Sequence, residues 1–448
     1  MTEGTPERRL LWLAYFFPPL GGGGCQRTIK MVRYLEPLGW SSTVITTRDS
    51  DYWILDRSLC EEIPPAAQVI RVGALTSHRL IRLLGRSGLP VETRQGARRP
   101  AIFRTLRRLQ SWLLVPDGYV AWSRAAGRAA RTRIAAGGIA ALWTTSSPES
   151  AHVAGLALRK RFGIPWVADF RDPWVGRVTY APPSPWHDRR HRALEGAVVR
   201  SATRVTVVSE EMAALYRERY PDLPPERIVV LPNGVDSDDW RCAEALSSQS
   251  LSEDESIDRG RFVMLHAGQL AHRPTARTLL EGARRAIAAE PSLAHELRIR
   301  FVGGNEEIAP GDPLLTALGD VVLMVPSRPH LEALAAMRRA DSLLLLGHGG
   351  PADALLYTGK IYEYLTSGRP VLAIVDSGPA ARLLHEDARH TVLYAEDVDG
   401  AAAAIRRMVR DWRGRKGPVE EPPKTPRRAW ERQFLASQAA EMLSQIVD

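Results

Sequence analysis

Cysteine is scarce in this 448-residue chain, which has only Cys25, Cys60 and Cys242, far apart in the sequence. An odd number of cysteines without a C-x-x-C pair argues against a disulfide scaffold and against a zinc ribbon. The chain also lacks an apolar run of the roughly 18 residues that a membrane span needs. The apolar stretch from Leu10 is short and broken by two prolines, so we interpret it as a buried strand rather than a signal peptide. We therefore expect a cytoplasmic protein.

Lysine is scarce as well, since only five of the 60 basic residues are Lys and the others are Arg. The formal net charge is nevertheless +9. A basic chain favours nucleic acid, an anionic membrane surface or phosphorylated substrates as partners. A general use of Arg in place of Lys gives the same composition. Charge alone therefore selects none of these partners.

Continuous apolar runs alternate with helical segments through most of the chain. This pattern is typical of parallel sheets covered by helices on both faces. Each half opens with an apolar run, a Gly-containing turn and a helical segment, so we predict an α/β fold with two Rossmann-like domains. The expected strands are LLWLAYFF, SSTVITT, AALWTTS, IPWVADF, RVTVVS and RIVVLPNG in the first half, and RFVMLHAG, LRIRFVGG, VVLMVP, ADSLLLLG and PVLAIV in the second.

A domain boundary is expected after the motif LPNGVD. Residues 1–237 would form the N-terminal domain and residues 238–426 the C-terminal domain. A last amphipathic helix, about 427–448, would pack back on the N-terminal domain. The polar, acidic and Ser-rich stretch 242–260 is interpreted as a linker.

Glycines follow the first strand of each half. FPPLGGGGCQR places Gly22 and Gly23 before a helix, where backbone N–H groups can approach a phosphate. HAGQLAHR places Gly268, Gln269 and Arg273 after a strand, where open α/β sheets bind ligands. A flexible turn and a solvated arginine are the alternatives for these two motifs.

The run YTGKIYEYLTSGRPVLA is a candidate diphosphate and ribose site. Thr358, Gly359 and Lys360 would open a helix, which brings free N–H groups and an ammonium together. Glu363 lies on the same helix face, where a carboxylate can accept hydrogen bonds from both ribose hydroxyls. An ordinary solvated Lys–Glu pair is the alternative.

The motif WVADFRDPW places Asp169, Arg171 and Asp172 at the end of an apolar strand, close to Trp174. These side chains could bind the hydroxyls of a sugar or position an acceptor, and a salt-bridged turn is the alternative. Three D-x-D pairs lie in turn-like polar stretches, where Asp is expected for local hydrogen bonds. We therefore expect no metal site and no cofactor.

In their order, these motifs resemble those of the GT-B glycosyltransferases, specifically the retaining family 4 glycosyl transferases of bacterial polysaccharide and glycolipid pathways. The similarity extends over VPDGYVAW, TTSSPESAH, VTVVSEEM and VVLPNGVD as well, and covers nearly the whole chain. It implies two Rossmann-like domains facing across a cleft, with the acceptor on the N-terminal side and a nucleoside-diphosphate sugar on the C-terminal side.

The resemblance also implies site roles. The donor sites would be Gly22, Gly23, Gly268, Gln269, Thr358, Gly359, Lys360 and Glu363; the catalytic residues Asp169, Arg171, Asp172, Arg273 and Lys360; and the acceptor sites Arg27, Asp172 and Trp174. Two positions depart from the family pattern. Leu355 stands where the first glutamate of a pair is expected, and Gln269 stands where an arginine is usual.

The predicted reaction is transfer of a sugar to a hydroxyl of a glycan, lipid-linked sugar or small molecule, with retention and without a metal. Arg273 and Lys360 would stabilise the charge of the leaving diphosphate. The alternatives are a GT-B-shaped sugar-nucleotide epimerase and a non-catalytic protein that binds nucleotide sugar or nucleic acid. Because region 79–108 is basic with few aromatics, we expect it to face a lipid-diphosphate acceptor or the anionic inner face of the cell membrane, as a peripheral contact, rather than nucleic acid. A solvated helix is the alternative for this region.

Overall fold

The computed structural model describes residues 8–48, 55–74, 109–247, 257–270, 273–303, 308, 311–355, 359–414 and 426–447. The chain folds into two compact units. Of the described residues, the first unit contains those up to Gly234 and those from Arg428 onward, and the second contains those from Val235 to Arg427. The basic region 79–108 and Thr358 lie outside the described residues.

The first unit is built on a seven-stranded sheet in the order β3-β2-β1-β4-β5-β6-β7, and every neighbouring pair is parallel. Its strands are β1 (Arg8–Leu13), β2 (Trp40–Thr47), β3 (Gln68–Val72), β4 (Ala141–Ser146), β5 (Trp166–Phe170), β6 (Arg204–Val207) and β7 (Ile228–Val230). Its α-helices are α1 (Gly23–Leu35), α4 (Val120–Ala135), α5 (Ser150–Phe162), α6 (Pro185–Ser201), α7 (Glu210–Arg219) and α17 (Arg432–Val447).

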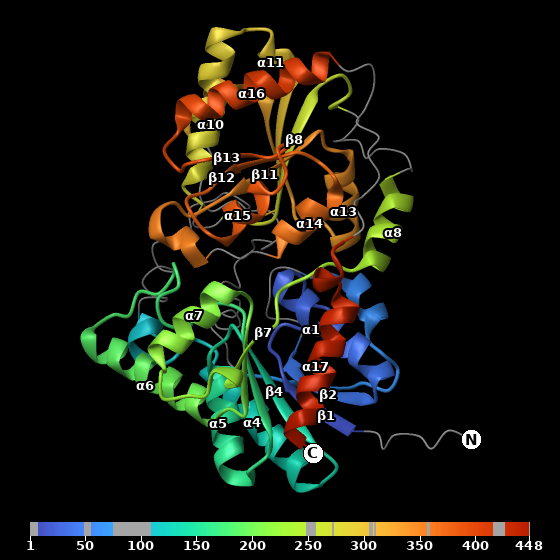
Figure 1. Cartoon of the computed structure of the whole chain (residues 1–448), viewed down its shortest axis with the longest axis vertical. Helices are drawn as coiled ribbons and strands as arrows, with labels where there is room; N and C mark the ends of the chain where they lie inside the picture. The colour runs from blue at the N-terminus through green and yellow to red at the C-terminus, as the bar shows by residue number, and fades with distance from the viewer. Residues whose placement is uncertain are drawn as a thin grey trace, which may run out of the picture. The chain divides into compact units, whose positions relative to one another are not determined.

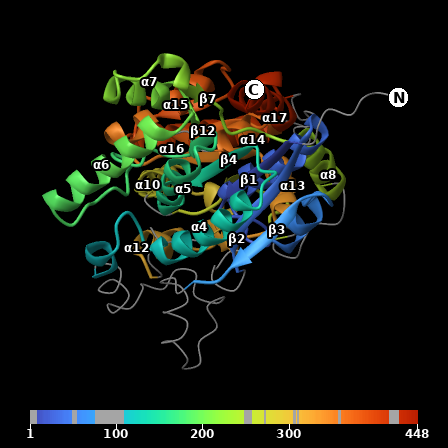
Figure 2. The same ribbon diagram turned by 90° about the horizontal axis from the view of Figure 1, so that it is seen from below.

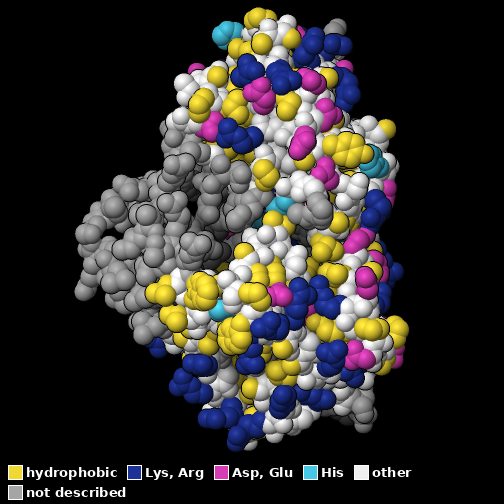
Figure 3. Space-filling model, turned by 90° about the vertical axis from the view of Figure 1, so that its left-hand side faces the viewer, with side chains coloured by type: hydrophobic (Ala, Val, Ile, Leu, Met, Phe, Trp, Pro, Cys, Tyr) yellow, Lys and Arg dark blue, Asp and Glu magenta, His cyan; other side chains and the backbone are white. Residues whose placement is uncertain are grey.

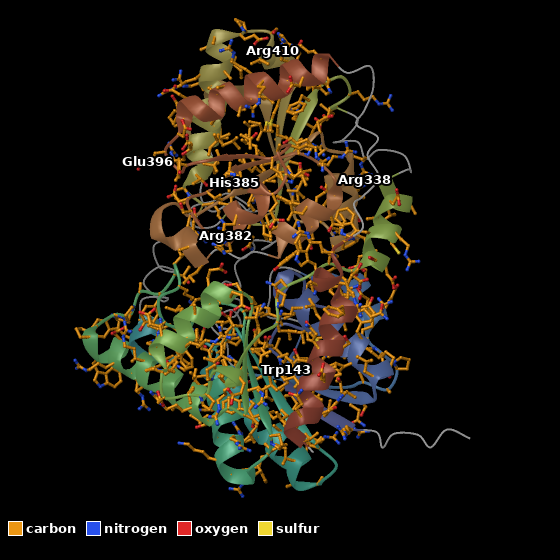
Figure 4. All side chains as sticks on the ribbon, in the orientation of Figure 1. Trp143, Arg338, Arg382, His385, Glu396 and Arg410 are labelled. Atoms are coloured by element: carbon orange, nitrogen blue, oxygen red, sulfur yellow. The ribbon has the colours of Figure 1, made fainter. Side chains whose placement is uncertain are left out.

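Helices cover both faces of this sheet, with α4 and α5 on one face and α17 on the other (Figures 1 and 2). Under α1 and α17 the core holds large aromatic side chains. Trp143, labelled in Figure 4, stacks against Trp12 with ring centroids 4.9 Å apart. All residues of β2, β4 and β5 are buried, as expected for strands covered on both faces.

The second unit has a six-stranded sheet in the order β10-β9-β8-β11-β12-β13, again with parallel neighbours. Its strands are β8 (Phe262–Ala267), β9 (Leu297–Val302), β10 (Val322–Val325), β11 (Ser342–Leu346), β12 (Val371–Ile374) and β13 (Thr391–Leu393). Its α-helices are α8 (Ser237–Ser247), α10 (Thr275–Ala289), α11 (Leu293–Glu296), α12 (Pro313–Leu318), α13 (His330–Arg339), α14 (Lys360–Ser367), α15 (Pro379–His385) and α16 (Val398–Arg413).

The predicted α/β class with two Rossmann-like parallel-sheet domains is confirmed. One local prediction is wrong, because residues 242–247 of the expected linker belong to α8, which packs against α13. Buried Trp240 and Ala243 give this polar sequence an apolar face, and tertiary packing therefore overrides its Ser-rich composition. No helix in the described ranges has the length and apolar character that crossing a membrane requires.

Candidate functional site

The candidate donor site lies in the second unit, at the carboxyl ends of β8, β11 and β12. These strands are neighbours and parallel, so the segments that follow them meet at one edge of the sheet. The buried carboxylate of Asp353 holds two of these segments. It accepts hydrogen bonds from the backbone N–H groups of His348 at 2.8 Å and Gly349 at 3.2 Å, after β11, and of Asp376 at 2.8 Å, after β12.

Helix α14 begins at this edge, and its first residue is Lys360. Buried Ile361 and Tyr364 fix the inner face of the helix, and Gly368 ends it in the left-handed conformation with φ 76°. The hydroxyl of Tyr364 accepts a hydrogen bond of 3.0 Å from the backbone N–H of Ala267, the last residue of β8. This contact sets the start of α14 beside the end of β8.

The ammonium of Lys360 lies over the turn that follows β8. Its Nζ is 3.5 Å from Nε2 of His266, and the other ring nitrogen, Nδ1, is 2.9 Å from the carbonyl oxygen of Leu344. A carbonyl can only accept, so Nδ1 carries the hydrogen and the lone pair of Nε2 faces Lys360. Gly268 makes the approach possible, because a Cβ at this residue would lie 2.3 Å from Nζ.

Burial and a neighbouring cation lower the charge of this site in the absence of ligand. Desolvation, with a further contribution from Arg273, lowers the pKa of Lys360 to about 7, although Glu363 acts in the opposite direction. Burial, followed by the charge of Lys360, holds the pKa of His266 well below its ordinary value. His266 is therefore neutral, and an anion near Lys360 would restore the full charge of the ammonium.

Four other predicted residues of this site belong to the second unit, as Lys360 does. Nη1 of Arg273 lies 2.9 Å from Nε2 of His348, which accepts because a guanidinium only donates. Gly359 precedes α14 as its N-cap residue, and Glu363 is half-buried in its first turn. Gln269 is exposed.

The candidate acceptor side lies in the first unit, at the carboxyl end of β5, where Asp169 is deeply buried and saturated with hydrogen bonds. Its Oδ1 accepts from Nη2 of Arg27 at 2.7 Å and from Thr206 at 2.8 Å, and its Oδ2 accepts from Nε of Arg27 at 3.1 Å and from Thr145 at 2.9 Å. Although burial acts to raise it, Arg27 holds the pKa of Asp169 below its ordinary value.

The structure places three of the predicted residues in buried positions, and their roles remain predictions. Both carboxylate oxygens of Asp169 already accept hydrogen bonds, which favours positioning of Arg27 over contact with substrate. Arg27 is 5% exposed and paired with Asp169, which favours a structural role over contact with an acceptor. Trp174 is 1% exposed, and its Nε1 lies 2.9 Å from Nδ1 of His191. Residue type and position could not reveal this burial.

Arg171 and Asp172 remain accessible at the same strand end. The guanidinium of Arg171 donates to the carbonyl oxygens of Ser146 and of Ser147, the latter at 2.8 Å, and it lies over the ring of Phe16. A Cβ on Gly24 would lie 1.9 Å from Nη1 of Arg171, so glycine is needed there. Asp172 is exposed.

Gly22 and Gly23 lie at the start of α1, as its N-cap and its first residue. Both are exposed, and a Cβ at either residue would meet no atom within 4 Å. Gly22 has φ 93°, a backbone conformation that favours glycine. The backbone there is open to approach from outside.

Sequence reasoning missed an interacting acidic pair, Asp117 and Glu149, although both residues lie in motifs that carry the family resemblance. Glu149 is buried and ion-paired with Arg177. Asp117 accepts from the backbone N–H groups of Tyr119 and Ser150, both at 2.8 Å. Burial, followed by the charge of Glu149, raises the pKa of Asp117 to about 7. The motifs VPDGY and SSPES carried this signal, but nothing in them shows that they meet.

No cluster of three or more His, Cys, Asp or Glu side chains suited to a metal ion occurs among the residues that the structure describes. The expectation of a metal-independent site remains a prediction.

Comparison with known proteins supports the family resemblance. Residues 21–239 match the family described as Glycosyltransferase Family 4. A curated relative, D-inositol 3-phosphate glycosyltransferase 1 of Catenulispora acidiphila, is 27% identical over 247 residues, which cover 51% of this chain and 54% of that protein. The match thus spans about half the length of the curated relative.

Solved structures with the same fold cover nearly the whole chain. An α,α-trehalose-phosphate synthase (UDP-forming) of Burkholderia xenovorans, in complex with glucose-6-phosphate, is 11% identical with a TM-score of 0.61, over 98% of this chain and 97% of that one. HepE of Anabaena in complex with UDP-glucose is 16% identical with a TM-score of 0.56, over 98% and 95%. In sequence and in fold, the chain resembles the family 4 glycosyltransferases of GT-B type.

Proposed function

We propose that the chain is a glycosyltransferase that moves a sugar from a nucleoside-diphosphate sugar to a hydroxyl acceptor, with retention and without a metal. The observation that carries this proposal is the approach of Lys360 to the turn after β8, with Arg273 nearby and Glu363 one helical turn further on. The family match and the curated relative, itself a glycosyltransferase by name, support it.

The chemistry needs positive charge where the leaving diphosphate develops negative charge. Lys360 and Arg273 supply two cationic side chains, and free N–H groups at the start of α14 add the positive end of the helix dipole. Burial, with repulsion from Arg273 adding to it, keeps the pKa of Lys360 low in the free protein. The diphosphate would relieve this repulsion, so the site favours a polyanion.

The remaining donor contacts follow from the direction of α14. Glu363 would accept hydrogen bonds from the ribose hydroxyls, and the donor sugar would lie beyond the diphosphate. Leu355, at the end of a short 3-10 helix (Gly350–Leu355), offers this sugar an apolar contact in place of a carboxylate. UDP is the first nucleotide to test, because the Anabaena structure contains UDP-glucose.

Retention is proposed through attack on the same face of the sugar. The departing phosphate would take the proton of the acceptor hydroxyl, while the glycosyl carbon becomes oxocarbenium-like. In the first unit, Arg171 and Asp172 are the accessible side chains that would contact the acceptor. The acceptor is proposed as a glycan, a lipid-linked sugar or a small molecule with a free hydroxyl.

A thermal-shift panel tests donor binding. The intact protein is heated with UDP, GDP, TDP, ADP and their common sugar conjugates, each with and without EDTA. A ligand that binds only the folded state raises Tm by mass action. One base should stabilise the protein with EDTA present, and Lys360→Met should abolish the shift. Lys160→Met, which changes an exposed lysine on α5, is the matched control.

A transfer assay then tests the reaction. The stabilising sugar nucleotide is incubated with acceptor mixtures, and the anomeric configuration of the product is read by NMR. Release of the nucleoside diphosphate with an α-linked product from an α-linked donor supports the proposal. Absence of any nucleotide-induced shift, or loss of transfer on addition of EDTA, contradicts it.

The epimerase alternative is not favoured. That reaction would need acid and base side chains around the donor sugar. The two described histidines of this site are already engaged, His266 with Lys360 and His348 with Arg273.

A further inference from the structure

Exposed hydrophobic side chains gather at one place on the first unit. Ten large hydrophobic side chains are exposed in the described part of the chain, and five of them lie in two neighbouring segments. Leu113 is 70% exposed, Trp186 55% and Trp112 52%. We call this group the tryptophan patch, and its members are Leu109, Trp112, Leu113, Leu114 and Trp186. Figure 3 faces the side of the molecule on which α6 lies, where hydrophobic side chains gather among those of Lys and Arg.

His187 joins the two segments and holds the indoles in place. Its Nε2 lies 3.1 Å from the carbonyl oxygen of Trp112, and its Nδ1 lies 2.8 Å from Oγ of Ser184. The rings of Trp112 and Trp186 both meet the imidazole edge-on, at centroid distances of 5.2 and 4.8 Å. Because His187 is 4% exposed, a buried residue fixes two half-exposed tryptophans.

Positive charge lies beside the patch. Arg189 and Arg190 are exposed in α6, directly after Trp186 and His187. The nearby carboxylate of Asp188 is balanced, since it pairs with Arg192 at 2.8 Å and accepts from Tyr180 at 2.7 Å.

We propose that the tryptophan patch docks the protein on the surface of an anionic lipid bilayer. Indoles and leucines would enter the headgroup region, where an amphipathic ring is most stable, and the flanking arginines would contact lipid phosphates. Charge complementarity selects this partner, because the exposed charged side chains that directly follow Trp186 and His187 include the guanidinium groups of Arg189 and Arg190. The proposal is independent of the sugar transfer proposed above.

Vesicle sedimentation of the intact protein tests the docking. Vesicles of phosphatidylcholine with 30% phosphatidylglycerol should bind the protein about 10-fold or more tightly than phosphatidylcholine alone, roughly as expected when several arginines act together. Raising the salt concentration to about 0.5 M should release most of the protein, since exposed charges are then screened.

Variants locate the contact. Leu113→Glu places a negative charge on a side chain that is already exposed, and it should weaken binding at least 10-fold without lowering Tm. Trp112→Ala and Trp186→Ala should also weaken binding. Leu38→Ala, at an exposed leucine elsewhere in the first unit, is the control for apolar area. The double variant Arg189→Gln, Arg190→Gln tests the charge beside the patch. The double variant Arg131→Gln, Arg133→Gln, in exposed positions of α4, is its control.

Three results would overturn the proposal. Equal binding of Leu113→Glu and the unchanged protein to vesicles would show that the patch does not contact the lipid. Equal binding of the unchanged protein to neutral and anionic vesicles would show that charge does not contribute to binding. A dimer in solution that Leu113→Glu converts to a monomer, with no vesicle binding, would assign the patch to a second copy of the chain.

Discussion

Arg27 and Asp169 form a buried ion pair between α1 and β5, with Nη2 2.7 Å from Oδ1. The same guanidinium donates to the carbonyl oxygens of Leu231 and Pro232, both at 2.9 Å. One side chain therefore connects the glycine-rich turn and α1 with the middle of the sheet and with the segment that leaves β7. This connection fixes the backbone on which Gly22, Gly23 and Arg171 are presented.

Removing one partner of this pair should strongly destabilise the protein. Asp169→Asn leaves a buried guanidinium without its carboxylate, and we expect a loss of about 3–5 kcal/mol in the free energy of unfolding. Arg27→Met should cost a similar amount, and the double variant less than the sum of the two. Urea denaturation measures these differences. Fully additive losses would contradict the pairing.

The pH dependence of nucleotide binding should report Lys360. Its pKa is about 7 in the free protein, so the charged fraction falls as pH rises above 7. Between pH 7 and 9 the diphosphate is fully ionised, since its last proton dissociates near pH 6. Affinity should therefore fall by up to about 10-fold per pH unit in this range. Calorimetric titration measures it.

Two lysine variants test whether Lys360 causes this pH dependence. Lys360→Met should bind weakly at every pH and show no slope, whereas Lys160→Met should keep the slope of the unchanged protein. A wild-type affinity that stays constant from pH 7 to 9 would show that the ammonium does not contact the diphosphate.

Glu363→Ala should weaken nucleotide binding by roughly 10- to 100-fold, because hydrogen bonds to a charged group contribute about 1.5–3 kcal/mol. The effect of Glu363→Ala should depend on the ribose. An inorganic diphosphate should therefore bind the unchanged protein and Glu363→Ala equally. Glu332→Ala changes the exposed carboxylate in the first turn of α13 and serves as the control. Equal weakening for diphosphate and nucleotide would place Glu363 away from the ribose.

Gly268→Ala should abolish nucleotide binding. Its Cβ would lie 2.3 Å from Nζ of Lys360, and the φ of 115° disfavours any side chain. Gly260→Ala is the matched control, because it carries the same kind of backbone strain at φ 77° with no atom within 4 Å of the new Cβ. Both variants should lose stability, but only Gly268→Ala should lose the thermal shift with nucleotide. Retained binding in Gly268→Ala would contradict the role of the Lys360 ammonium.

The sequence allowed the two sheets to be predicted because their central strands are continuous apolar runs, such as Leu343–Leu346 in β11. The edge strands β3 and β13 escaped prediction. Residues Gln68–Val72 and Thr391–Leu393 are short and only partly buried, so they carry little of the pattern that marks a central strand.

The candidate site was predictable where its residues are close in sequence and not where the fold assembles it. Gly359, Lys360 and Glu363 share one helix turn, so spacing alone brings them together. Arg27 and Asp169 are 142 residues apart, and nothing in either motif indicates that they neutralise each other. Asp353 was missed for a similar reason, because its role depends on backbone N–H groups that only the folded segments bring to it.

The position of the last helix has a consequence for the order in which the two units fold during synthesis. Leu435, Ala436 and Leu443 of α17 fill the apolar core over α1, yet the ribosome adds them only after the whole second unit. During synthesis, the core of the first unit therefore remains incompletely packed until α17 is made, whereas the second unit can already fold. A shortened chain that stops before Arg428 should therefore leave the α1 face bare and bind chaperones, however well its seven strands pair.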